Sequence, residues 1–496
     1  FDDPVRGHDV VRPPGGRIPR GLQRLLRANP YPPGILIMVT LESLGSADFK
    51  RRHGLRHAYV AGSMVRGISS VEMVINMARA GFLGYFGTGA LHDDAIEEAL
   101  LAIKAGVSDG QSWGMNLLNN ATNPQAEMDT VNLFLRHNVK RVEASAYMQI
   151  TPALVVYRAK GLRPRQGGGV DVENLLLAKL SRPEIATIFM EPAPEKIVKN
   201  LLDEDLISQL EAELLCQVPM ADDICVEADS GGHTDMGVMA TLLPTICRLR
   251  DELSHQHGYD MPICVGGAGG IGTPEAAATA YILGADFILT GSINQCTVES
   301  GTSDAVKDIL QQINIQDTDY CPSGSLFELG AKTQVVKKGV FFPARAKKLY
   351  DLWKNHNSLD EIDPKTRIQI EEKYFKRSFE DVWDETFTYY KKAAPEEAEK
   401  AAANPKQKMA MIFRWYFVHT MRLAMDGTAG RKIDYQIHCG PALGAFNQWV
   451  KGTELDDWRN RRVAEIGLRL LEDTAELLNQ RFAALSSPAQ VHSISA

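Results

Sequence analysis

Paired cysteines are the first feature that this chain of 496 residues lacks. Its seven cysteines are odd in number, are scattered from Cys216 to Cys439 and include no Cys-x-x-Cys pair. Disulfide frameworks and structural zinc sites need cysteines or histidines at short, regular spacings. The pattern therefore excludes a disulfide-stabilised secreted fold and a zinc module. We expect reduced thiols, no metal site and a cytoplasmic protein.

Long apolar runs and an excess of positive charge are missing as well. No stretch approaches the ~20 apolar residues of a membrane span, and residues 2–33 are rich in Arg, Pro and Gly, unlike the apolar core of a signal peptide. A formal net charge of −8 argues against broad nucleic-acid binding, which needs a basic face. We therefore predict no membrane and no nucleic-acid partner.

What the sequence does contain, between residues 57 and 292, is an alternation of β-rich runs and amphipathic stretches. We expect strands at 57–64, 82–87, 112–118, 141–146, 174–180, 223–229, 262–267 and 286–291. We expect helices at 70–80, 93–105, 124–137, 151–160, 182–190, 237–255 and 274–283. Eight parallel strands is the count that closes a barrel, whereas an open doubly wound sheet more often has five to seven. The predicted fold is α/β, a (β/α)8 TIM barrel.

Three segments do not belong to this repeat: an N-terminal extension, an inserted helical pair and a C-terminal helical region. We predict an N-terminal extension at 1–56 with a strand-like run at 35–40, the barrel at 57–302 with an inserted helical pair near 192–218, and a helical lid subdomain at 303–496. The β signal largely stops after Ser303, where long amphipathic helices such as 371–392 and 456–481 are separated by breaks at Pro364, Pro395 and Pro405.

Glycines follow the last three predicted strands, within 224–235, 262–272 and 287–292. Strand ends that become glycine-rich just before a helix expose backbone N–H groups, which suit a phosphate. The alternative is that the glycines only permit tight turns. The phosphate hypothesis assigns these cofactor contacts: Gly269, Gly270, Ile271, Gly291 and Ser292.

A histidine, His233, comes directly after Gly231 and Gly232 at the end of the sixth strand. The carboxyl ends of barrel strands form the active face, and imidazole exchanges protons near neutral pH. We predict that His233 is catalytic and that the two glycines contact the cofactor. The alternative is a capping histidine in an ordinary strand-to-helix turn.

Two polar residues, Asn116 and Lys179, lie at the ends of strands three and five and are predicted to contact the cofactor. A lysine in an apolar strand is costly to bury unpaired, so Lys179 needs an anionic partner. This is either the N1/O2 edge of a reduced flavin or a structural carboxylate such as Glu143 or Glu227. The end of the first strand offers backbone groups to a flat ring, at Gly62, Ser63 and Met64.

Positive charge is enriched early in the helical region, at Arg345, Lys347 and Lys348 among others. Such a cluster can dock an acidic carrier protein or NADPH. The alternative is an ordinary solvated face. Aromatic residues such as Phe413, Trp415, Tyr416 and Phe417 are expected in a helical core.

Residues 227–235, with Gly269, Gly270, Ile271, Gly291 and Ser292, resemble the nitronate monooxygenase-like group of FMN barrels. A longer likeness, to the PfaD-type trans-acting enoyl reductases of polyunsaturated-fatty-acid and trans-acyltransferase polyketide synthases, lies in the segments 177–184, 191–195, 294–295, 299–302, 414–416 and 434–442. The resemblance implies FMN, NADPH as electron donor, and an enoyl thioester on an acyl carrier protein. It also implies a substrate or carrier role for Asn294 and Gln295. One departure is the glycine pair at 266–267, slightly before the expected phosphate glycines.

The resulting hypothesis is an NADPH-dependent FMN enoyl reductase, expected to be a homodimer. One rival is a nitronate monooxygenase that uses oxygen, with His233 as base. Another is a non-catalytic scaffold, which would purify without colour.

Overall fold

The computed structural model describes residues 38–120 and 123–486, and the unit that begins at Thr40 contains the whole barrel. Most of the N-terminal extension, including residues 35–37 of the predicted strand, lies outside the described residues. Residues 38–40 form no strand. Thr40 caps the 3-10 helix η1 (Leu41–Ser43), and the short helix α2 (Ala47–His53) follows.

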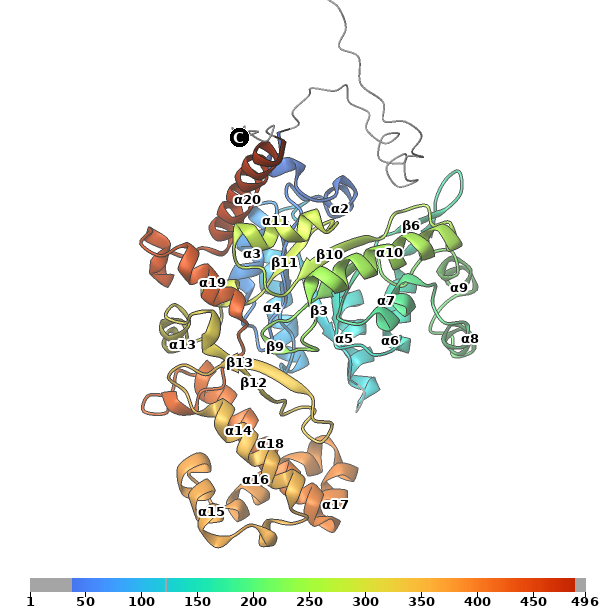
Figure 1. The fold of residues 1–496 in the computed structure, drawn as a ribbon. Helices are drawn as coiled ribbons and strands as arrows, with labels where there is room; N and C mark the ends of the chain where they lie inside the picture. The colour runs from blue at the N-terminus through green and yellow to red at the C-terminus, as the bar shows by residue number, and fades with distance from the viewer. Residues whose placement is uncertain (1–37, 121–122, 487–496) are drawn as a thin grey trace, which may run out of the picture. The chain divides into compact units, whose positions relative to one another are not determined.

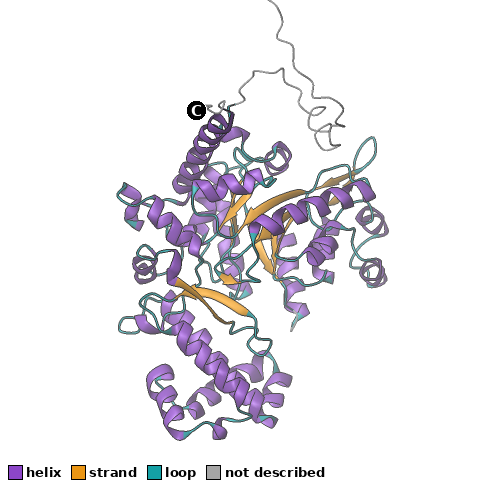
Figure 2. Cartoon of the chain, in the orientation of Figure 1, coloured by secondary structure: helices purple, strands orange, loops and turns teal. Residues whose placement is uncertain are grey.

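Eight parallel strands close into a barrel, as the sequence predicted (Figures 1 and 2). They are β1 (Tyr59–Ala61), β2 (Leu83–Phe86), β3 (Gly114–Leu118), β4 (Arg141–Ser145), β7 (Leu175–Leu180), β8 (Asp223–Glu227), β10 (Cys264–Ala268) and β11 (Ile288–Thr290). The first and last strands pair in parallel, with Val60 opposite Leu289, so the sheet has no free edge. The strand order β1-β11-β10-β8-β7-β4-β3-β2 excludes the open doubly wound sheet.

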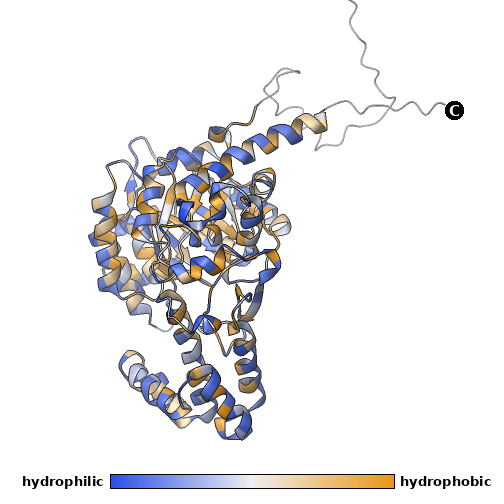
Figure 3. Ribbon diagram, turned by 90° about the vertical axis from the view of Figure 1, so that its left-hand side faces the viewer, coloured by the Kyte–Doolittle hydropathy of each residue, from blue (hydrophilic) through white to orange (hydrophobic). Residues whose placement is uncertain are grey.

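The barrel helices begin and end within a few residues of the predicted positions. They are α3 (Val71–Arg79), α4 (Asp93–Gly106), α5 (Pro124–Arg136), α6 (Pro152–Lys160), α7 (Pro183–Met190), α10 (Met239–His257) and α11 (Pro274–Ile282). Several start with proline at the first turn after a capping Asn or Thr, as at Asn123, Thr151 and Thr273. Figure 3 shows hydrophilic and hydrophobic residues intermixed along the helices of the described chain. The inserted pair is α8 (Glu195–Asp203) and α9 (Gln209–Leu215).

Helix α2 closes the amino-terminal end of the barrel. Phe49 is fully buried and stacks on Phe287, with the ring centroids 4.2 Å apart. His53 Nε2 lies 2.7 Å from a carboxylate oxygen of Asp223, which also accepts a hydrogen bond from Arg52. Because this end is filled by apolar packing and a buried ion-pair cluster, the carboxyl ends of the strands are left for a ligand.

After the barrel the chain is mainly helical, and the predicted breaks at Pro364, Pro395 and Pro405 each start a helix. The helices are α12 (Ser292–Gln295), α13 (Asp304–Leu310), α14 (Phe342–Asn355), α15 (Pro364–Gln369), the π-helix η4 (Ile370–Phe375), α16 (Phe379–Ala393), α17 (Pro395–Ala403), α18 (Pro405–Met425), α19 (Pro441–Trp449) and α20 (Val463–Ser486). The single helix predicted at 371–392 is wrong. Lys376 adopts a left-handed conformation and Ser378 caps a new helix, so the run is divided. No helix in the described ranges is long and apolar enough to cross a membrane.

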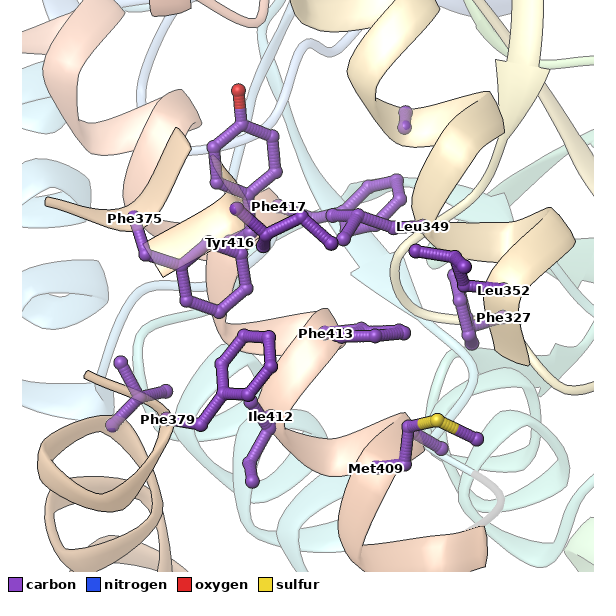
Figure 4. Close-up of a cluster of buried hydrophobic side chains, with 14 of the residues drawn as sticks. Phe327, Leu349, Leu352, Phe375, Phe379, Met409, Ile412, Phe413, Tyr416 and Phe417 are labelled. Carbon is purple, nitrogen blue, oxygen red and sulfur yellow. The ribbon is translucent and has the colours of Figure 1, made fainter. Parts of the chain in front are cut away.

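Aromatic and aliphatic side chains from α14, η4, α16 and α18 form a second core (Figure 4). Phe375 stacks on Tyr416 at 5.4 Å, and Phe327 packs edge-on against Phe417 at 5.6 Å. Phe413, Tyr416 and Phe417 are buried, which confirms the predicted helical core. The last helix, α20, packs instead against α3 and α11 of the barrel.

The chain after Ser303 is largely helical, as expected, but it contains one hairpin that the sequence did not predict. A hairpin of β12 (Thr318–Pro322) and β13 (Lys332–Val336) pairs with the two-residue strand β9 (Gly232–His233), which lies between the barrel and the helices (Figure 1). Nothing in the sequence pattern indicated the small hairpin of β5 (Leu162–Pro164) and β6 (Val170–Val172). Runs this short become strands because a partner is present, which the sequence pattern does not reveal.

Candidate active site

Polar side chains meet inside the barrel at the carboxyl end, around the fully buried Glu143 of β4. Glu143 Oε2 accepts hydrogen bonds from the backbone N–H of Ser63, at 3.1 Å, and from its hydroxyl. The amide of Asn116 donates to the Glu143 backbone oxygen at 2.9 Å. The structure thus brings together Ser63 and Asn116, two of the predicted cofactor contacts, through a carboxylate that was considered only as a possible partner of Lys179.

Lys179, on β7, lies with its Nζ 3.9 Å from Glu143 Oε1. Of the two partners considered for Lys179, the structure therefore contains the structural carboxylate, Glu143. Burial alone would lower the pKa of Lys179, but the nearby carboxylates of Glu143 and Glu227 outweigh burial and raise it. Burial also raises the pKa of Glu227, against the opposing effect of Lys179. The floor of the barrel mouth consequently holds one cation between two acids.

The glycines after β10 and β11 leave bare backbone facing open space. Gly270 has φ +75°, and a Cβ added at Gly270 or at Gly291 would meet no atom within 4 Å. Gly269 is different, since an added Cβ would lie 2.7 Å from the backbone of Ala228. The earlier glycines, Gly266 and Gly267, belong to β10 and pack within the barrel wall. Ile271 is buried. The early glycine pair, which departs from the family pattern, is therefore explained by packing within β10.

His233 does not cap a strand-to-helix turn, because it lies in β9 and α10 begins only at Met239. Its Nε2 is 2.6 Å from the hydroxyl oxygen of Ser323 and 2.9 Å from that of Ser325. The ring reaches solvent, yet the protein around it disfavours the imidazolium and lowers the pKa of His233. His233 is thus a mostly neutral imidazole held by the loop of the β12–β13 hairpin.

Asp229, which follows β8, fastens the same hairpin to the barrel. Its carboxylate accepts hydrogen bonds from Thr234 at 2.9 Å, from the hydroxyl of Tyr320 and from the Gln334 amide at 3.4 Å. The sequence analysis assigned no role to Asp229. Two of its partners, Tyr320 and Gln334, are about ninety or more residues away in the chain, so no local signal pointed to this role.

A segment that we name the mouth strap, residues 435–442, crosses the carboxyl end of the barrel. Gly440 N donates to Ser292 Oγ at 3.0 Å, after β11. On the β8 side, a Cβ added at Gly231 would lie 2.7 Å from Gly440 N, so the two backbones are in close contact. Val336 N donates to Ile437 O at 2.9 Å. The resemblance had covered this segment, but its place at the site was not predicted.

The remaining predicted residues divide into buried and exposed ones. Asn294 is fully buried and donates to Thr290 O at 3.0 Å, and Gln295 is also buried, so both face the interior in this structure. The surface role predicted for Arg345 is wrong, because its guanidinium is buried and pairs with Asp434. Lys347 and Lys348 are exposed.

All seven cysteines are free thiols. Over the described ranges, no group of three or more His, Cys, Asp or Glu side chains is placed to hold a metal ion.

Comparisons with known families and proteins agree with this architecture. The nitronate monooxygenase family profile matches residues 50–325, more than half of the chain. A second profile, described as the inserted helical domain of [acyl-carrier-protein] S-malonyltransferase, matches residues 356–435. These two matches divide at the β12–β13 hairpin and α14, where the structure changes from barrel to helices.

Two curated relatives are much longer than this chain. Polyketide biosynthesis protein PksE of Bacillus subtilis (strain 168) is 55% identical over 451 residues, which cover 91% of this chain and 58% of PksE. Polyketide biosynthesis protein ThaF of Burkholderia thailandensis is 53% identical over 449 residues, which cover 90% of this chain and 38% of ThaF. A protein of the polyunsaturated fatty acid synthase of Thraustochytrium sp. is more distant, at 41% identity over 84% of this chain and 28% of its own length. The chain therefore spans between about a quarter and little more than half of these relatives.

Among solved structures, the enoyl reductase domain of MlnA, from the macrolactin biosynthesis cluster of Bacillus amyloliquefaciens, is 44% identical with a TM-score of 0.86. The match covers 90% of this chain and 100% of that domain. The fold, the family profile and the likeness to the whole MlnA domain agree with the PfaD-type resemblance. The chain therefore belongs to the nitronate monooxygenase family, in the group that contains the MlnA enoyl reductase domain.

Proposed function

We propose that this protein is an NADPH-dependent FMN enoyl reductase that acts in trans on enoyl thioesters carried by an acyl carrier protein. The observation that carries the proposal is the match to the whole of the MlnA enoyl reductase domain at 44% identity. Family membership favours a flavin, whereas FMN and NADPH in particular come from the resemblance. Location in the cytoplasm and a homodimeric state remain predictions.

The residues at the mouth fit a flavin nucleotide. Gly270 and Gly291 border open space with bare backbone, which suits a terminal phosphate. Ser292 Oγ accepts from Gly440 N, and a hydroxyl that accepts can also donate, here to a phosphate oxygen. At the floor, Lys179 offers the positive charge that an electron-rich ring edge requires. The predicted contacts at Gly62, Ser63, Met64, Asn116, Gly231, Gly232, Gly269 and Ile271 remain part of the proposal.

When bound, FMN would accept hydride from NADPH and deliver it to the β-carbon of an α,β-unsaturated thioester. The chain's own groups position the substrate and manage charge and protons. Lys179 stabilises negative charge at the floor, where Glu143 pairs with it and Asn116 in turn donates to Glu143. His233, neutral and bonded to Ser323 and Ser325, is placed to pass a proton at the rim. The strap crosses the mouth between Ser292 and Gly231, where we expect it to limit access of water.

The carrier-protein part of the proposal is supported by two comparisons. The curated relatives are named as polyketide or polyunsaturated-fatty-acid synthase proteins. The profile that matches residues 356–435 is named for an enzyme that acts on an acyl carrier protein. A helical region with that likeness, next to the barrel mouth, is a reasonable place for a carrier to dock.

The test begins with the cofactor. Mass spectrometry of the purified protein should find about one FMN per chain and no FAD. NADPH oxidation should then depend on an enoyl thioester such as crotonyl thioester. His233→Ala should slow enoyl reduction by about 10²-fold or more, the usual size for a lost acid or base. Rapid mixing separates NADPH oxidation from thioester reduction, and wild-type rates in both steps would remove His233 from the mechanism.

Gly270→Glu tests the phosphate cup, because its carboxylate would stand against the phosphate and should empty the site. Gly339→Glu is a matched control. Gly339 is exposed, has φ +74° against +75° for Gly270, and likewise has no atom within 4 Å of an added Cβ. Both variants carry the same backbone strain and the same charge. Full flavin content in Gly270→Glu would show that the phosphate binds elsewhere.

The second candidate is a nitronate monooxygenase, which the profile match over residues 50–325 favours. The two activities differ in their electron donor and acceptor. Anaerobic NADPH should bleach the flavin of an enoyl reductase, whereas a nitronate monooxygenase should consume oxygen with an alkyl nitronate and ignore NADPH. A colourless, folded protein would support the scaffold alternative instead.

A further inference from the structure

The mouth strap carries a second histidine, His438, beside the glycines that precede His233. His438 forms an antiparallel bridge with Val335 of β13, and the neighbouring β13 residue, Gln334, pairs with Gly232. A Cβ added at Gly232 would have one heavy atom within 4 Å, Nδ1 of His438 at 3.8 Å. The two histidines therefore stand on adjacent segments at the barrel mouth, although they are about two hundred residues apart in the chain.

The hydrogen bonds around His438 define its tautomer. Its Nε2 lies 2.7 Å from the amide nitrogen of Gln436, and Gln436 Oε1 accepts from Thr420 at 3.4 Å. With the Gln436 amide nitrogen facing the ring, as the structure assigns it, His438 Nε2 is the acceptor, because an amide nitrogen only donates. A neutral imidazole has one N–H, which therefore lies on Nδ1. Burial, and repulsion from His233 when that ring is protonated, lower the pKa of His438 to about 4, which keeps the ring neutral at pH 7.

The fold does not use Nδ1 of His438. Within the described residues, the hydrogen bond of this ring is the one to Gln436, and it involves Nε2. The strap is held by its own backbone N–H groups. Cys439 N donates to Gln334 O of β13, and Gly440 N donates to Ser292 Oγ after β11. A donor without a partner among the described residues, beside Gly232 at the barrel mouth, is available to a ligand.

We propose that His438 donates a hydrogen bond from Nδ1–H to the thioester oxygen of the substrate. The assignment rests on the proposed enoyl reduction. When hydride, with its two electrons from NADPH, joins the β-carbon, the C=C electron pair moves toward the α-carbon and the thioester oxygen. A proton from another donor, His233 or water, then completes the saturated thioester. His438 stabilises the oxygen's developing charge without giving up its proton, as a neutral imidazole can.

Three substitutions at one position test this role. His438→Ala removes the donor, whereas His438→Asn places an amide N–H near the position of Nδ1. His438→Gln extends past it, toward the position of Nε2. His438→Ala should slow thioester reduction by about 10²- to 10³-fold, the usual effect of losing one oxyanion donor, with NADPH oxidation changed less than about twofold. His438→Asn should reduce the thioester at least about tenfold faster than His438→Ala, and His438→Gln should not.

His419→Asn is the matched control. His419 is also a histidine whose pKa burial lowers to about 4, but it stacks on Trp415 in the helical region. It should keep both half-reactions. Flavin content must match wild type in every variant that is compared, so that lost cofactor is not read as lost catalysis.

A second measurement is independent of turnover. ¹⁵N spectra of histidine-labelled protein, with the His438 signals identified by their absence in His438→Asn, should show a neutral ring protonated at Nδ1 at pH 7. An Nε2–H or charged ring would overturn the assignment, as would wild-type thioester reduction by His438→Ala, or an Asn variant as slow as Ala. Wild-type protein that reduces no enoyl thioester would instead overturn the proposed function, and the role of His438 with it.

Discussion

Replacing Lys179 with methionine should destabilise the barrel, because this side chain is the cation between two acids at the floor of the mouth. Methionine keeps most of the length and apolar surface of lysine and removes the charge. Glu143 is completely buried, and the Lys179 side chain is 13% exposed. Their interaction is therefore poorly screened by solvent, unlike that of a surface ion pair.

The expected loss can be worked from the geometry. Two unit charges 3.9 Å apart interact by about 4 kcal/mol at an effective dielectric constant of about 20. Removing one member of a buried pair typically costs about 3–5 kcal/mol. Glu143 Oε2 keeps its donors, Ser63 and Asn116, so Oε1 alone loses its charge partner. We therefore expect Lys179→Met to lower the free energy of unfolding by about 2–3 kcal/mol.

The assay is urea unfolding followed by fluorescence, with Glu143→Gln and the double variant completing a cycle. The double variant has neither charge. Its loss of unfolding free energy should therefore be smaller than the sum of the two single losses by at least about 1.5 kcal/mol. The Glu227 pKa, already raised by burial, should rise further without Lys179. An acid with a raised folded pKa loses stability as pH rises, so the deficit of Lys179→Met should grow above pH 4.5 and shrink below it.

Strictly additive losses would refute this account of the floor, as would a deficit below about 0.5 kcal/mol, the size seen for exposed pairs. A deficit that is flat with pH would show that Glu227 is not part of the cluster.

Three further predictions concern the helical region. Asp434→Asn, which leaves two arginines without their carboxylate, should cost about 3–5 kcal/mol in urea unfolding, whereas Lys348→Glu should change stability by less than about 0.5 kcal/mol. Since burial lowers the pKa of His419 to about 4, wild-type stability should fall more steeply below pH 6.5 than that of His419→Gln; parallel curves would contradict this. Charge reversal at Lys347 and Lys348 should raise KM for carrier-bound enoyl substrate at low salt and leave a small thioester unaffected, and equal effects on both would exclude carrier docking there.

The barrel could be predicted because its signal is local and repeated. Each strand is an apolar run with a helix of 3.6-residue periodicity after it, and proline starts with Asn or Thr caps mark the helices. The glycine ends at Gly270 and Gly291 were predicted for the same reason, since they follow strands directly. Their open surroundings are consistent with a phosphate cup, which remains a proposal.

The rest of the mouth depends on contacts between distant residues. β9 has two residues and exists because β13 pairs with it, from about one hundred positions later. Arg345 reads as one more surface cation in a basic run, and its burial follows from Asp434, 89 residues away. Charge patterns along the chain could not separate Arg345 from Lys347 and Lys348, because the difference between them arises from packing.

The close contact of Gly231 with Gly440 links the two ends of the candidate site. A Cβ at Gly231 would lie 2.7 Å from Gly440 N, and one at Gly440 would lie 3.0 Å from Gly231 N, so each glycine makes room for the other's backbone. Gly440 N also donates to Ser292 Oγ beside the proposed phosphate cup, and His438 lies two residues earlier on the same strap. A side chain at either glycine must therefore displace the strap. Because the strap is bonded to both places, such a change would alter the Ser292 hydroxyl and the His438 donor together.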